Sequence, residues 1–82
     1  SCLGLAYNAL KTGKNAPATL NAANEIAVEA FLNKQIGFLD ISKTIESVLD
    51  AVPTANLDTL ASVVENDQLS RQIAKSVIES RA

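Results

Sequence analysis

The chain has 82 residues, of which 48% are hydrophobic, and it carries seven lysines and arginines against nine aspartates and glutamates. This length fits one domain, and the high apolar fraction with a net charge of only -2 excludes an intrinsically disordered segment. The lack of histidine and the single cysteine exclude a zinc site of the usual Cys/His kind and a His-based catalytic triad within the chain.

Apolar residues recur at helical spacing through nearly the whole chain, and no pair of strands is predicted. The first predicted helix covers residues 3–12 and ends at Gly13, because glycine adopts the left-handed conformation of a helix C-cap without a steric clash. A loop over residues 12–17 follows, and Pro17 suits the start of the next helix, where its missing N–H is not needed. The second predicted helix, over residues 18–33, is rich in alanine. We therefore expect neighbouring helices to approach it closely and place it near the middle of a bundle.

The third predicted helix spans residues 39–52 and has one apolar face, formed by Ile41, Ile45, Val48, Leu49 and Val52. Thr44 and the charged residues of this helix are expected to face water. Pro53 ends the helix, because proline disfavours a helical conformation at the residue before it.

The last third of the chain contains two predicted helical pieces. A short one covers residues 57–64, and a longer one runs on to the C-terminus, with Asn66 and Asp67 as a break and a new N-cap between them. One continuous helix through Asn66 is the alternative. Together the segments predict an all-α fold, a small bundle of four main helices plus a short one.

Two pairs of residues on the second predicted helix are candidates for function. Glu25 and Glu29 share a helix face, but a carboxylate metal site in a bundle needs ligands from other helices, so solvated carboxylates are the simpler interpretation. Asn21 and Asn24 lie three apart in an otherwise apolar segment. Either Asn21 caps the helix start and Asn24 is exposed, or these amides bind backbone groups of an adjacent element, since a buried amide must be hydrogen-bonded. No catalytic, cofactor-binding or metal-ligating residue is predicted.

Two further residues suggest chemistry that the surrounding sequence does not support. Ser42 follows Asp40 near a helix start, as in acyl carrier proteins, which carry phosphopantetheine on a serine. In that family the aspartate directly precedes the serine, whereas Ile41 intervenes here. Cys2 has no cationic neighbour in sequence to activate its thiol. A single cysteine forms no internal disulfide, which favours a reducing compartment.

The sequence also excludes two kinds of partner. With a net negative charge and only two arginines, the chain lacks the basic face that a nucleic-acid backbone requires. The chain contains no run of about 18 apolar residues, so we expect no membrane span. No apolar leader preceded by lysine or arginine is visible, so we expect no export signal.

Three segments, taken in order, are similar to the C-terminal part of one enzyme family, 1-deoxy-D-xylulose 5-phosphate reductoisomerase. They are Cys-Leu-Gly-Leu-Ala-Tyr at 2–7, Leu-Asn-Ala-Ala-Asn-Glu-Ile-Ala-Val-Glu-Ala-Phe-Leu at 20–32 and Ile-Gly-Phe-Leu-Asp-Ile at 36–41. Asp67, four residues before Arg71, is compatible with the same pattern, whereas Gly13-Lys14 departs from it, since the family often has two glycines there. The resemblance implies that residues 1–82 are a single C-terminal helical domain of a larger enzyme.

The resemblance implies an activity that this chain does not carry by itself. Members of the family convert 1-deoxy-D-xylulose 5-phosphate to 2-C-methyl-D-erythritol 4-phosphate, an early step of the non-mevalonate isoprenoid pathway, using NADPH and Mg²⁺ or Mn²⁺. Their nucleotide-binding fold and their catalytic and metal-binding residues precede the C-terminal domain, and the three glycines here, at 4, 13 and 37, form no dinucleotide-binding fingerprint. We therefore expect an accessory domain that packs against the catalytic domain of the same polypeptide, with Asn21 and Asn24 near that interface. The parent enzyme is expected to be a homodimer in a bacterial cytoplasm or a plastid stroma.

Two other functions stay open from the residues alone, a free-standing helical protein-interaction module and an acyl carrier-like protein. We also expect the chain, separated from its catalytic domain, to expose apolar surface at Leu3, Leu5 and Leu39 and to self-associate.

Overall fold

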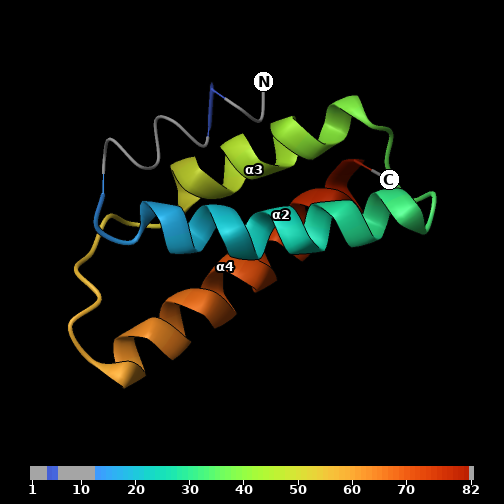
Figure 1. Ribbon diagram of the computed structural model, residues 1–82. Helices are drawn as coiled ribbons and strands as arrows, with labels where there is room; N and C mark the ends of the chain where they lie inside the picture. The colour runs from blue at the N-terminus through green and yellow to red at the C-terminus, as the bar shows by residue number, and fades with distance from the viewer. Residues whose placement is uncertain (1–3, 6–12, 82) are drawn as a thin grey trace.

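The computed structural model describes residues 4–5 and 13–81, and these residues form helices and connecting loops without any strand. The helices that pack against one another there are α2 (Ala16–Leu32), α3 (Leu39–Ala51) and α4 (Leu60–Arg81) (Figure 1). The all-α prediction is confirmed, whereas a bundle of four main helices plus a short one is not what this part of the chain shows. Gly4 and Leu5 of the first predicted helix are helical, and the rest of that prediction lies outside the described residues.

Helix α2 begins at Ala16, two residues earlier than predicted, with Pro17 in its first turn. A proline is tolerated there because the first N–H groups of a helix have no intrahelical partner. Gly13, just before the helix, has a φ of +71°, the left-handed conformation that the sequence predicts. The predicted role of Gly13 in capping a helix over residues 3–12 falls on residues outside the described part.

The alanines of α2 form the inner face of the helix. Ala22, Ala23, Ala27 and Ala30 are each at most 3% exposed. Helix α2 packs on both α3 and α4, and Figure 1 shows it lying across the two. Because alanine adds little beyond its Cβ, two helices can approach the same stretch of α2 closely. Helices α3 and α4 also contact each other, so the predicted central place of α2 in the bundle stays a prediction.

Helix α3 buries the face that the sequence predicts and one residue beyond it. Ile41, Ile45 and Val48 are buried. Val52, also buried, caps the helix with extended backbone before Pro53, as expected. Thr44 was predicted to face water, and this is wrong, because its side chain is fully buried. α3 contacts both α2 and α4, so a wider arc of its surface is covered than a single apolar stripe indicates.

Helix α4 is continuous through Asn66, so the predicted break at Asn66 and Asp67 is wrong. Asparagine disfavours helix interiors when its side chain competes for nearby backbone groups, but here the Asn66 amide is buried and bonded to other parts of the bundle. The residues that cap the N-terminus of α4 lie earlier in the chain than Asn66. The Ser62 N–H donates to Thr59 Oγ1 at 3.0 Å and the Thr59 N–H donates to Ser62 Oγ at 3.1 Å, a reciprocal cap at the N-terminus of α4.

The apolar core lies where the inner faces of α2, α3 and α4 meet, with Ile45 and Val48 at its centre. Leu5 is half-buried and packs against this core, so its predicted exposure is wrong. Leu39 is 74% exposed, as expected, and Leu3 lies outside the described residues. Within the described part of the chain, no helix is long and apolar enough to cross a membrane.

Candidate domain interface

A buried amide network joins the start of α2 to the middle of the chain. Asn15 Nδ2 donates to the Pro53 carbonyl oxygen at 2.8 Å and to Asn66 Oδ1 at 2.9 Å, and the Ala55 N–H donates to Asn15 Oδ1 at 2.9 Å. Asn66 Nδ2 in turn donates to Thr19 Oγ1 at 3.1 Å. All of these side chains are buried, so each polar atom needs the partner it has.

This network fixes the non-helical connector between α3 and α4. Residues 53–58 have no regular secondary structure, and two of their backbone groups bond to the side chain of Asn15. Asn15 precedes the first residue of α2 but makes no side-chain cap to that helix, because its amide is used across the bundle. The sequence interpretation missed this residue, since an asparagine before Ala16-Pro17 reads only as a loop or cap position.

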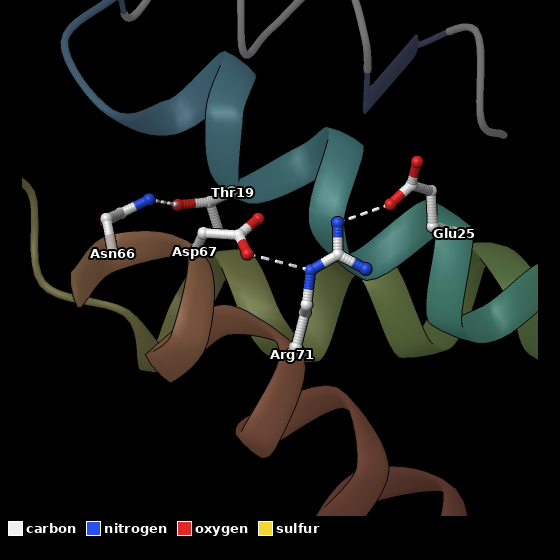
Figure 2. Close-up of polar contacts among 5 residues, drawn as sticks. All are labelled: Thr19, Glu25, Asn66, Asp67 and Arg71. Carbon is white, nitrogen blue, oxygen red and sulfur yellow. Dashed lines mark hydrogen bonds and ion pairs between the residues drawn. The ribbon is translucent and has the colours of Figure 1, made fainter. Parts of the chain in front are cut away.

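An ion-paired arginine joins α4 to α2 beside the network. Arg71 Nε donates to Asp67 Oδ2 at 2.9 Å, one helical turn earlier, and Arg71 Nη2 donates to Glu25 Oε2 (Figure 2). These hydrogen bonds, first that to Asp67 and then that to Glu25, raise the pKa of the Arg71 guanidinium. Both carboxylates are largely exposed, so water screens the pairs and each contributes less than about 1 kcal/mol to stability. Their main effect is to hold the guanidinium and Glu25 in place.

The two candidate interface residues, Asn21 and Asn24, lie on the exposed surface of α2. Asn21 lies well inside the helix, whose N-cap is Asn15, so the alternative in which Asn21 caps the helix start is wrong. Neither side-chain amide takes part in a hydrogen bond with the described residues. Both side chains are exposed, and their place at a domain interface stays a prediction.

The other candidate residues, Glu25, Glu29 and Ser42, lie on helix surfaces and do not come together in a site. Glu25 and Glu29 are exposed, as predicted, although Glu25 is also held by Arg71. The Ser42 hydroxyl donates to the Leu39 carbonyl oxygen of its own helix at 3.4 Å. Among residues 4–5 and 13–81, no group of three or more carboxylate, thiol or imidazole side chains is placed to hold a metal ion.

Comparison with known proteins identifies the family of this chain's relatives. The model of the DXP reductoisomerase C-terminal domain matches residues 1–73. A curated 1-deoxy-D-xylulose 5-phosphate reductoisomerase from Vesicomyosocius okutanii is 49% identical over 79 residues, which cover 96% of this chain and 21% of that protein. The enzyme of the same name from Cupriavidus necator is 48% identical over 81 residues, covering 99% of this chain and 21% of its own length.

A solved structure agrees with these sequence matches. The 1-deoxy-D-xylulose 5-phosphate reductoisomerase from Zymomonas mobilis, in complex with NADPH, superposes with a TM-score of 0.90 at 47% sequence identity. The match covers 94% of this chain and 20% of the solved one. The chain thus spans about a fifth of the length of the relatives it matches.

Proposed function

Because the chain belongs to the DXP reductoisomerase C-terminal domain family, we propose that residues 1–82 are one accessory domain of a longer polypeptide with 1-deoxy-D-xylulose 5-phosphate reductoisomerase activity. The observation that carries the proposal is the asymmetry of the matches. Identity near 48% extends over nearly all of this chain, yet over only about a fifth of each relative. An acyl carrier would not give such a match.

On this proposal the whole polypeptide converts 1-deoxy-D-xylulose 5-phosphate to 2-C-methyl-D-erythritol 4-phosphate with NADPH and Mg²⁺ or Mn²⁺. The part of the chain that the structure describes does not fit either cofactor, because it has no cluster of metal-ligating side chains and its glycines are scattered. We therefore assign both cofactors to the portion that precedes this domain. The polypeptide is proposed to act as a homodimer in a bacterial cytoplasm or a plastid stroma.

The role of this domain is mechanical support of the catalytic portion. Small displacements of reacting groups slow an enzyme strongly, so a rigid neighbouring domain that fixes the elements around an active site contributes to rate without touching substrate. The structure supports this role in two ways: the buried network of Asn15 and Asn66 stiffens one end of the bundle, and the exposed amides of Asn21 and Asn24 offer bonds to a partner.

The activity assignment predicts a simple division of function. The longer polypeptide should oxidise NADPH in the presence of 1-deoxy-D-xylulose 5-phosphate and Mg²⁺, followed as loss of absorbance by NADPH. The 82-residue chain alone should show no such oxidation and no NADPH binding by calorimetry. NADPH binding by the isolated chain would contradict the accessory role, and a longer polypeptide without turnover would contradict the family activity.

The interface role of the two exposed amides predicts an effect in the longer polypeptide. Asn21→Ala combined with Asn24→Ala should weaken docking of the domain by about 1–3 kcal/mol, because each lost hydrogen bond contributes about 1 kcal/mol. We expect a lower unfolding temperature and a lower kcat with little change in KM. The matched control is Asn33→Ala with Asn56→Ala, two other exposed asparagines. If the test and control variants behave alike, these amides are not at the interface.

A further inference from the structure

The outward surface of α2 carries a second stripe opposite its buried alanines. Asn21, Asn24, Val28 and Leu32 follow one another at steps of three or four, so they share one side of the helix. Asn21 and Asn24 are exposed, Val28 is half-buried and Leu32 is 71% exposed. Val28 packs against the hydrophobic core, so the exposed part of this side consists of Asn21 and Asn24 in its first half and Leu32 at its end.

A second exposed apolar side chain, Phe38, lies at the end of the α2–α3 connection. The ring of Phe38 meets the ring of Phe31 edge to face, with centroids 5.8 Å apart, and Phe38 remains 71% exposed. Leu32 and Phe38 are therefore large apolar side chains that lie mostly open to solvent. Clusters of this kind, next to polar groups, are typical of surfaces that meet a partner.

We propose that the exposed side chains of Asn21, Asn24, Leu32 and Phe38, which we call the α2 outer face, dock onto the preceding part of the same polypeptide. The inference rests on the proposed function and deepens it, because it names the surface and the kind of segment it takes. Leu32 and Phe38 anchor apolar side chains of that segment. The two amides, which both donate and accept, bind its backbone N–H and C=O groups.

Two observations indicate which segment binds the α2 outer face: the length of the relatives and the charge of the face itself. The relatives are about five times as long as the part that this chain matches, so most of the polypeptide is tethered to this domain and present at high effective concentration. The residues that define the face are uncharged, and the neighbouring carboxylate of Glu25 is paired with Arg71, so Glu29 is the exposed charge beside the face on α2 and the face does not favour a strongly basic or acidic ligand. A second copy of the chain is not covalently linked to this domain, so its effective concentration at the α2 outer face is lower.

Photo-crosslinking in the full-length polypeptide tests the proposal. Leu32 is replaced with p-benzoylphenylalanine, and Phe38 is replaced in the same way in a second variant in case the first disturbs folding. Leu60, the first residue of α4 and 80% exposed, serves as the matched control position. After irradiation, mass spectrometry should find crosslinks from positions 32 and 38 to peptides that precede this domain, at least fivefold more abundant than those from position 60.

Three results would overturn the assignment: no crosslink from positions 32 and 38, equal yields from position 60, or crosslinks only between copies in a mixture of isotope-labelled and unlabelled protein. NADPH oxidation is measured on the same unirradiated samples. A polypeptide that turns over normally but gives none of the expected crosslinks disproves the α2 outer face as the docking surface and leaves the proposed function intact. Loss of turnover in the unmodified polypeptide disproves the function instead.

Discussion

Asn15→Ala is expected to lower the free energy of unfolding of the 82-residue chain by about 3 kcal/mol. The substitution removes three hydrogen bonds, those to the Pro53 carbonyl, to Asn66 Oδ1 and from the Ala55 N–H. It also leaves the carbonyl oxygen of Asn66 buried without this donor, and an unsatisfied buried group is more costly than the lost bond alone. The connector over residues 53–58 loses its attachment to α2.

Urea unfolding followed by circular dichroism at 222 nm measures this change. Asn21→Ala is the matched control, an asparagine of the same region that is exposed and makes no bond to the described residues, and we expect it to stay within about 0.5 kcal/mol of the parent chain. Combining Asn15→Ala with Asn66→Ala should cost less than the sum of the single variants, because the two amides share one bond. Additive effects, or a cost for Asn15→Ala no larger than the control, would show that the network is not a unit.

The helices that local patterns predict best are those whose signals lie within a few residues of one another. The repeat of Ile41, Ile45 and Val48 gives the buried face of α3, and Pro53 gives its end, because both depend on chain geometry over one or two turns. The alanines of α2 indicate close packing by neighbouring helices for the same reason, and both α3 and α4 contact this helix. These features need no knowledge of which helices are neighbours.

The errors concern residues whose role depends on contacts distant in sequence. Asn66 has the propensity of a helix break, but its amide bonds to Asn15 and Thr19, which are 51 and 47 residues away. Thr44 is fully buried, and no periodic pattern of one helix shows which other parts of the chain pack against it. Buried polar groups are thus the least predictable part of this fold, since a polar residue reads as exposed until its partner is known.

The candidate site was predictable only in part. Asn21 and Asn24 drew attention as polar residues in an apolar segment, and the structure shows them exposed on α2. The apolar half of the same face was not predicted, because Leu32 belongs to the helical pattern and reads as core, although it is 71% exposed. Leu5 gave the opposite error, since it was expected at the surface and packs against the core. The interface role of the two amides stays a prediction.

Ile45→Ala should destabilise the chain by about 3 kcal/mol, within the range of about 2–5 kcal/mol for such truncations, because it leaves a cavity where α2, α3 and α4 meet. Ile45 is 1% exposed and is the largest of the fully buried side chains among the described residues. A domain of this size has a total stability of about 4–12 kcal/mol, so the loss is a substantial fraction of it. In the longer polypeptide the same change should lower the temperature at which turnover fails, while KM measured well below that temperature stays unchanged.

Leu39→Ala is the control for this prediction, since it removes a large apolar side chain from the same helix at a position that is 74% exposed. On the isolated chain it should change the free energy of unfolding by less than about 0.5 kcal/mol. The comparison separates core packing from the mere loss of apolar side-chain atoms, because only Ile45 lies in the core. If Ile45→Ala lowers stability yet leaves the heat resistance of turnover in the longer polypeptide unaltered, the catalytic portion does not depend on a rigid C-terminal bundle, and the supporting role proposed for this domain fails.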